Sequence, residues 1–182
     1  MTLGFYIDND RCFGCSTCSM ACTTTKLPGN RAVFMRRVRR IRSEEPRALS
    51  FVSMSCNHCA DPACLRACPQ GAYEKLDNGI VRQSHDKCIG CRACIEACPY
   101  DAPAFDEVSR SVYKCDLCAD RLDRGQPPAC VESCPGANIA YGELNDLRSQ
   151  HPDAADRIPG VTPDPAATQP SLLIRVDRAL VG

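Results

Sequence analysis

Sixteen cysteines, grouped in four short runs, constrain this chain more than any other feature. Each run holds four cysteines, and the last two are always four residues apart. The runs are Cys12, Cys15, Cys18 and Cys22; Cys56, Cys59, Cys64 and Cys68; Cys88, Cys91, Cys94 and Cys98; and Cys115, Cys118, Cys130 and Cys134. No cysteine is left over, so the pattern predicts that all of them bind metal.

The spacing within the runs indicates [4Fe–4S] clusters. The third run has the full C-x2-C-x2-C-x3-C-P spacing of bacterial ferredoxins. The first run has Thr23 instead of the proline, and the second and fourth runs have a wider middle gap. The first three cysteines of a run converge on one cluster. The backbone N–H groups of the loop can donate hydrogen bonds to the sulfurs of that cluster. The fourth lies one helical turn, about 6 Å, further along and ligates the neighbouring cluster.

Zinc, haem and disulfides are the alternatives for so many cysteines. Zinc knuckles usually present two ligands each, whereas these runs crowd three into a short loop. No histidine completes a C-x-x-C-H haem motif, and we interpret His58, inside the second run, as a loop residue rather than a ligand. Disulfide scaffolds belong to small secreted domains, and the N-terminal sequence does not have the pattern of a secretory signal. Iron–sulfur clusters are therefore favoured.

Composition supports metal as the main stabilising element and excludes several functions. The chain has no tryptophan and only five tyrosines and five phenylalanines, so burial alone would give a weak core. The 22 basic and 22 acidic residues balance, which argues against nucleic-acid binding. No stretch approaches the roughly 18 apolar residues of a membrane span. Nucleotide-binding motifs and a nucleophile–base pair are also missing, so we expect a non-catalytic, electron-transferring protein.

The segments between the runs predict an α+β fold. Short strands are expected before each run, at residues 5–7, 49–54, 80–82 and 111–113. The turn Asp77-Asn78-Gly79 predicts a hairpin over residues 72–81, and residues 104–113 predict a second one. Residues 143–150 are typical of a short helix, and residues 172–176 of a final strand. The proline-rich segment 152–170 is expected to extend over a surface.

The pairing of the runs is left open by their spacing alone. The first run could pair with the second and the third with the fourth, or the second and third could pair inside the first and fourth. The short link from Pro69 to Cys88 favours the nested arrangement. This gives two interlocked, tandem ferredoxin-like units, an outer one (1–30 plus 105–142) and an inner one (49–104). An arginine-rich connector (31–48) and an extended C-terminal wrap (143–182) complete the predicted domain organisation.

The connector concentrates positive charge. It contains a basic stretch that ends at Glu44 and Glu45 and consists of Arg36, Arg37, Arg39, Arg40 and Arg42, with Arg31 just before it. We interpret them as a solvated strand or loop face, with contact to an acidic partner surface as the alternative.

Several longer motifs carry a family resemblance. They are Gly4-Phe5-Tyr6-Ile7-Asp8, Ser55-Cys56-Asn57-His58-Cys59, Asp61-Pro62-Ala63-Cys64, Cys88-Ile89-Gly90-Cys91-Arg92, Ala97-Cys98-Pro99-Tyr100, Lys114-Cys115-Asp116 and Cys130-Val131-Glu132-Ser133-Cys134-Pro135. With the tail around residues 146–148 and 173–176, they resemble the iron–sulfur subunits of the dimethyl sulfoxide reductase family. Those four-cluster, ferredoxin-like proteins accompany molybdopterin catalytic subunits.

The resemblance implies the nested pairing and one ligand set per cluster. Since Cys91 and all the other positions are cysteines, it implies four [4Fe–4S] clusters. The sets are cluster 1, Cys12, Cys15, Cys18 and Cys134; cluster 2, Cys22, Cys115, Cys118 and Cys130; cluster 3, Cys56, Cys59, Cys64 and Cys98; and cluster 4, Cys68, Cys88, Cys91 and Cys94.

The resemblance also implies a role in anaerobic respiration. The chain is expected to relay single electrons between a quinol-oxidising membrane subunit, or another donor, and a molybdopterin subunit that reduces a small oxidised substrate. A polyferredoxin of a hydrogenase or formate–hydrogen system, and a zinc-stabilised scaffold, are the alternatives. The chain departs from the family in its short, arginine-rich connector, and it ends without the membrane helix of the related formate dehydrogenase subunit. We therefore expect a separate membrane anchor and co-export with a twin-arginine partner to the extracytoplasmic face, with a cytoplasmic location as the alternative.

Overall fold

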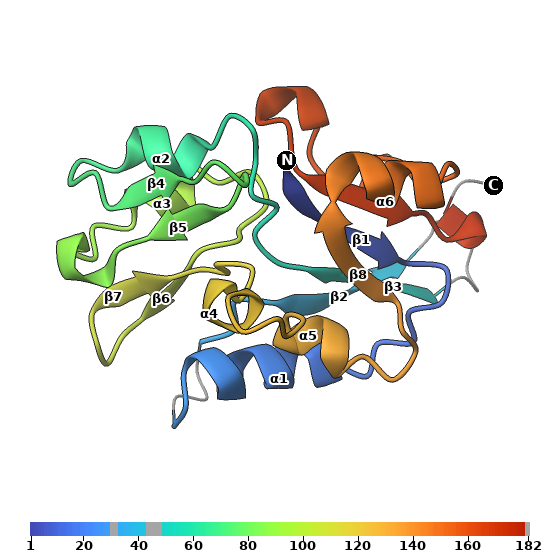
Figure 1. Ribbon diagram of the computed structural model, residues 1–182, viewed down its shortest axis with the longest axis horizontal. Coiled ribbons are helices and arrows are strands. Elements are labelled where there is room, and N and C mark those ends of the chain that lie inside the picture. The colour runs from blue at the N-terminus through green and yellow to red at the C-terminus, as the bar shows by residue number, and fades with distance from the viewer. Residues whose placement is uncertain (30–32, 43–48, 181–182) are drawn as a thin grey trace.

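The computed structural model describes residues 1–29, 33–42 and 49–180 and has an α+β fold of short elements (Figure 1). Its strands are β1 (Leu3–Asp8), β2 (Arg37–Arg42), β3 (Leu49–Met54), β4 (Tyr73–Lys75), β5 (Val81–Gln83), β6 (Ala104–Asp106), β7 (Ser111–Tyr113), β8 (Ile139–Glu143) and β9 (Leu172–Arg175). Its α-helices are α1 (Thr17–Lys26), α2 (Ala63–Ala67), α3 (Ala93–Glu96), α4 (Ala119–Leu122), α5 (Ala129–Glu132) and α6 (Leu144–Gln150). Short 3₁₀ turns lie at His85–Lys87, Pro165–Ala167 and Arg178–Leu180. The predicted α+β class is confirmed.

A three-stranded sheet joins the two ends of the chain. β1 lies in its centre, antiparallel to β8 and parallel to β9. Its apolar side chains, including Phe5 and Ile7, are buried with Ile174 of β9 in the main core. The predicted first and last strands are therefore confirmed, and the strand of the C-terminal segment is part of the central sheet.

The predicted hairpins are both present. β4 pairs with β5 and β6 with β7, each antiparallel. In the first hairpin Gly79 has φ +85°, the left-handed conformation that glycine adopts without strain, and its N–H bonds the carbonyl of Leu76. Figure 1 shows the two hairpins at one end of the molecule with α2 and α3, and the three-stranded sheet with α6 at the other.

The predicted helix at residues 143–150 is also confirmed. α6 starts at Leu144 because the carboxylate of Glu143 accepts the N–H groups of Asn145 and Asp146, at 2.8 and 3.2 Å. This capping satisfies N–H groups that have no partner inside the helix.

The described part of the arginine-rich connector contains a strand, β2. β2 pairs with β3 over six residues, so it forms a third antiparallel hairpin with the strand before the second run. Arg39 and Arg40 are exposed, as a solvated face predicts, but Arg36 is completely buried, which corrects the prediction for that residue. Arg31, Glu44 and Glu45 lie outside the described residues.

The proline-rich segment anchors the loop of the second run. It has little regular structure, as predicted, and the backbone N–H groups of Ala60 and Asp61 donate to Gln169 and Thr168, at 2.7 and 3.1 Å. The N–H of Ser171 donates to the carbonyl of Asn57, at 2.8 Å. The C-terminal wrap therefore holds a cysteine loop in place as well as covering it.

Truncation of Leu173 should destabilise the fold. This side chain is fully buried with Tyr6 and Leu147, and removing a buried leucine side chain typically costs about 2–5 kcal/mol. For a chain of this size, each kcal/mol lowers Tm by about 2–4 °C. Leu173→Ala should therefore unfold several degrees earlier in anaerobic calorimetry, whereas Val108→Ala, at an exposed turn, should match the parent. Equal midpoints for all three proteins would contradict this packing.

Candidate iron–sulfur centres

Three hollows in the structure are each lined by four cysteines. The first is lined by Cys12, Cys15, Cys18 and Cys134. The second is lined by Cys56, Cys59, Cys64 and Cys98, and the third by Cys68, Cys88, Cys91 and Cys94. They contain about 360, 330 and 290 Å³ of space free of protein atoms, open solvent at their mouths included. The similar sizes and equal donor sets suit the same group at all three.

The remaining four cysteines lie together in the protein core. Cys22, Cys115, Cys118 and Cys130 are all buried. The thiols of Cys22 and Cys115 each interact electrostatically with that of Cys130, and Cys22 also interacts with Cys118. All sixteen cysteines are within the described residues, and each is a free thiol rather than half of a disulfide.

Each cysteine loop contains a left-handed residue that turns its backbone N–H toward the first cysteine. Gly14, His58, Gly90 and Leu117, two residues after that cysteine, have φ of +78°, +45°, +69° and +59°. The N–H of His58 is 3.4 Å from Cys56 Sγ, and that of Leu117 is 3.3 Å from Cys115 Sγ. Non-glycine residues adopt this conformation at a cost of about 1–2 kcal/mol, which the complete burial of the apolar Leu117 side chain offsets in the fourth run.

The proline after a run determines how the chain leaves the helix. In the second, third and fourth runs the helix ends and a left-handed residue follows three positions after the last cysteine. The next N–H then donates to that cysteine at 3.3–3.5 Å, from Ala72 to Cys68, Ala102 to Cys98 and Asn138 to Cys134. In the first run Thr23 can donate its own N–H, and α1 continues to Lys26.

Buried hydroxyl groups beside the thiols support binding of a group that accepts hydrogen bonds. The hydroxyls of Tyr73 and Thr168 are buried, and neither forms a hydrogen bond to a protein oxygen or nitrogen that is resolved among the described residues. Tyr73 lies beside Cys94, and Thr168 beside Cys59. Buried polar groups are nearly always bonded, so such groups require a partner. Cysteine and sulfide sulfurs of a cluster would supply acceptors at both positions, and the residues therefore fit an iron–sulfur group.

Burial makes most of these thiols weak acids. It raises the pKa of Cys22 and of Cys64 to about 12, and that of Cys59 to about 11. The exposed Cys15 differs, because its hydrogen bonds to Thr17 lower the pKa of its thiol. Thiolates are the metal-binding form, so the buried cysteines become good ligands only when a positive centre such as iron lies next to them.

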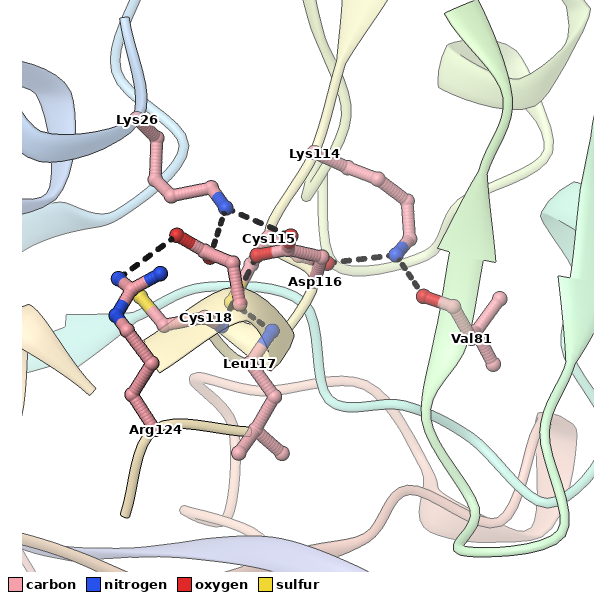
Figure 2. Close-up of polar contacts among 9 residues, drawn as sticks. Lys26, Val81, Lys114, Cys115, Asp116, Leu117, Cys118 and Arg124 are labelled. Carbon is pink, nitrogen blue, oxygen red and sulfur yellow. Dashed lines mark hydrogen bonds and ion pairs between the residues drawn. The ribbon is translucent and has the colours of Figure 1, made fainter. Parts of the chain in front are cut away.

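Two lysines brace the loop of the fourth run (Figure 2). Lys26 donates to Asp116 at 2.8 Å and to Asp120 at 2.6 Å, and Asp116 in turn accepts the N–H of Cys118 at 2.9 Å. Lys114 is buried and donates to the carbonyl oxygens of Cys115, at 2.6 Å, and of Val81. The loop is therefore tied to α1 on one side and to β5 on the other.

His58 is a loop residue, as predicted, but a completely buried one. Its Nδ1 accepts the N–H of Val81 at 3.1 Å, and its Nε2 has no partner within the described residues. Burial and the nearby charges of Lys114 and Lys75 hold the pKa of this imidazole well below its ordinary value. His58 is therefore neutral and links the second run to β5.

Sequence reasoning missed the polar side chains that surround the cysteines. Ser53 of β3 lies 3.2 Å from Cys18, and Thr168 of the proline-rich segment lines the second hollow. Both are distant in sequence from the cysteines they approach, so no local spacing could have indicated them.

Within the described residues, no three His, Cys, Asp or Glu side chains are placed to hold a single metal ion, and no helix is long and apolar enough to cross a membrane.

The loops, helical turns and cysteine groups define an iron–sulfur protein with ferredoxin-like domains. A family model described as a 4Fe-4S dicluster domain matches residues 47–144, and one described as a 4Fe-4S binding domain matches residues 9–25. The protein is 41% identical to an anaerobic dimethyl sulfoxide reductase chain of Escherichia coli (strain K12), over 94% of its own length and 87% of that relative. The corresponding chain of Haemophilus influenzae is 37% identical, over 96% and 89%.

More distant relatives are subunits of other oxidoreductases. A tetrathionate reductase subunit of Salmonella typhimurium is 36% identical, over 81% of this protein and 63% of that relative. The formate dehydrogenase-O iron-sulfur subunit of Escherichia coli is 34% identical, over 79% and 54%. The protein belongs to the iron–sulfur subunits of the dimethyl sulfoxide reductase family. It is thus an electron-transfer subunit that binds [4Fe–4S] clusters.

Adding a methyl group at Gly90 should impair the third hollow. A Cβ there would overlap the carbonyl oxygen of Arg110, and φ is +69°. Gly125 has the same φ but open space around it, so Gly125→Ala is a matched control for backbone strain alone. Gly90→Ala should lose up to about four irons per chain, one cluster's worth, whereas Gly125→Ala should keep the parental iron content. Equal iron in both variants would contradict this close approach.

Proposed function

We propose that the chain binds four [4Fe–4S] clusters and relays single electrons to a molybdopterin catalytic subunit without reacting with substrate itself. The observation that carries the proposal is the grouping of the cysteines. Three hollows have the ligand sets of clusters 1, 3 and 4, and the buried thiol group has that of cluster 2. When bound, the clusters supply one-electron chemistry, and the protein positions them and excludes water.

Shared helices support the nested pairing. α1, which contains Cys18 and Cys22, contacts α5, which contains Cys130 and ends just before Cys134. α2 likewise contacts α3, close to the last two cysteines of the second and third runs. Each contacting pair would thus ligate two clusters about one helical turn, roughly 6 Å, apart along the axis. Two interlocked ferredoxin-like units follow from this arrangement.

The order of the clusters follows from which thiols are neighbours. Clusters 1 and 2 share one helix pair, and clusters 3 and 4 share the other. Cys115, a ligand of cluster 2, interacts electrostatically with Cys56, a ligand of cluster 3. The proposed order is therefore 1–2–3–4, with clusters 2 and 3 adjacent across the boundary between the units.

Exposure of the loops marks the two ends of this series. In the first run Cys15 is exposed and Phe13 is 57% exposed; in the third run Cys91 is exposed and Ile89 is 62% exposed. The corresponding residues of the second and fourth runs are less exposed, since Asn57 and Cys118 are buried and Cys59 and Asp116 are half-buried. Electrons would therefore enter at one exposed loop and leave at the other, and partner subunits would cover both.

Metal analysis of the native complex, isolated anaerobically through this chain, tests the proposal. Four clusters predict about sixteen irons per chain, with further iron from partners and about one molybdenum per complex. Nickel instead of molybdenum would favour the polyferredoxin alternative. Zinc in place of iron would overturn the relay and favour a metal-stabilised scaffold.

Replacement of Cys91 should interrupt the series at cluster 4. Cys91→Ser should lose between about one and four irons, because serine is a poor substitute for a thiolate ligand, and should stop reduction of the catalytic subunit by the quinol. Ile89→Ala, in the same loop but without a ligand, should keep the parental iron content. Normal quinol-driven turnover in Cys91→Ser would contradict the relay.

The location of the complex is proposed from the family resemblance. A separate membrane anchor and co-export with a twin-arginine partner would place the chain on the extracytoplasmic face. Protease added to intact spheroplasts should then degrade this chain, whereas protection until lysis would favour the cytoplasmic alternative.

A further inference from the structure

The strongest unexplained feature of the interior is a buried arginine. The side chain of Arg36 is only 1% exposed, and no carboxylate pairs with it within the described residues. Its guanidinium donates to the carbonyl and the hydroxyl of Ser53, both at 3.1 Å, and to the hydroxyl of Ser55 at 2.8 Å. Its Nε has no hydrogen-bond partner in the described part of the chain, and its central carbon lies 4.7 Å from the centre of the Phe5 ring. Burying a charge without a counterion is costly, so this position requires a negative partner.

The surroundings of Arg36 indicate which partner this is. Burial lowers the pKa of Arg36, but the thiols of four cysteines more than offset this effect and hold the pKa above its ordinary value. These cysteines are Cys130, Cys115, Cys18 and Cys22. Three of them belong to the ligand set of cluster 2 and one to that of cluster 1. The charge of Arg36 therefore acts on ligands of both proposed clusters of the outer unit.

A direct hydrogen-bonded path joins Arg36 to one ligand. The hydroxyl oxygen of Ser53 is 3.1 Å from the guanidinium and 3.2 Å from Cys18 Sγ. Because the arginine donates to this oxygen, the hydroxyl proton is free to be donated to the cysteine sulfur. α1 also holds the backbone of Arg36 in place, since Ser19 donates its hydroxyl to the Arg36 carbonyl.

We propose that Arg36 is the fixed countercharge of clusters 1 and 2, and that Ser53 passes a hydrogen bond from it to the Cys18 sulfur. The proposal rests on the cluster assignment given above. A cluster with four thiolates becomes more negative when it accepts an electron, so a buried cation beside it stabilises the reduced form. Arg36 thus raises the reduction potentials of clusters 1 and 2 more than those of clusters 3 and 4.

Arginine is well suited to this position. The guanidinium stays protonated at any physiological pH, and its planar fork can donate to Ser53 and Ser55 simultaneously while lying over the ring of Phe5. The charge therefore does not vary with the redox state of the neighbouring clusters.

Redox titration followed by EPR in the purified complex tests the proposal. Arg36→Met should shift the redox equilibrium of at least one cluster toward its oxidised form by about tenfold or more. For a one-electron couple, each tenfold shift lowers the reduction potential by about 59 mV. Arg36→Lys should shift it less, because it keeps the charge. Ser53→Ala should lower only the potential of cluster 1. Arg40→Met, at an exposed position of β2, is the matched control and should leave all potentials unchanged.

The outcomes separate this inference from the proposed function. If the parent complex has four clusters and all potentials in Arg36→Met equal those of Arg40→Met, Arg36 is not the countercharge and the inference is overturned. If Arg36→Met loses iron, its potentials cannot be compared with those of the parent, and the test rests on the reduction potential of cluster 1 in Ser53→Ala. An unchanged potential overturns the inference, and a lowered potential supports it. If the parent complex holds no such clusters, the proposed function fails and this inference fails with it.

Discussion

Four residues, one turn of helix, separate the last two cysteines of every run, and the rest of the structure depends on this constraint. With the proposed ligand sets, the last two cysteines of a run bind different centres, so the helix of each run, together with the residues just after it, supplies ligands to two centres. Two such helices in contact, as α1 with α5, then bring two centres together. The hairpins and the three-stranded sheet hold the helix pairs in position, and a chain with few aromatic residues is stabilised around its metal sites.

The polypeptide backbone prepares these sites as much as the side chains do. Left-handed residues turn an N–H toward the first cysteine of a run, and the turn after each proline turns another toward the last. Hydrogen bonds to ligand sulfurs stabilise negative charge there and so influence reduction potentials. The first run has no proline, and its last cysteine, Cys22, lies in the continuing helix α1 close to Arg36. In the first run, the buried cation Arg36 therefore acts near the last cysteine, whereas the backbone N–H groups of the loop act near the first.

The sequence predicted those features that depend on local patterns. The two short hairpins, the helix capped by Glu143 and the strand before each run follow from turn residues, capping and alternation, and all are confirmed. Cluster type followed from cysteine spacing. The burial of Arg36 was not predictable, because it depends on packing between β3 and α1 rather than on its arginine-rich neighbours. The role of Thr168 was missed for the same reason, since it reaches the second run only through long-range folding.

The central position of β1 has a consequence for the biosynthesis of the protein. β1 is made before its sheet neighbours β8 and β9, and Cys134 joins the hollow that begins at Cys12. At about 5–20 residues per second, the first thiols wait several seconds for their partners. With the proposed ligand set, cluster 1 can be completed only after Cys134 has been made. During that interval the thiols of the first run stand without their full ligand set, open to oxidation as long as no metal holds them.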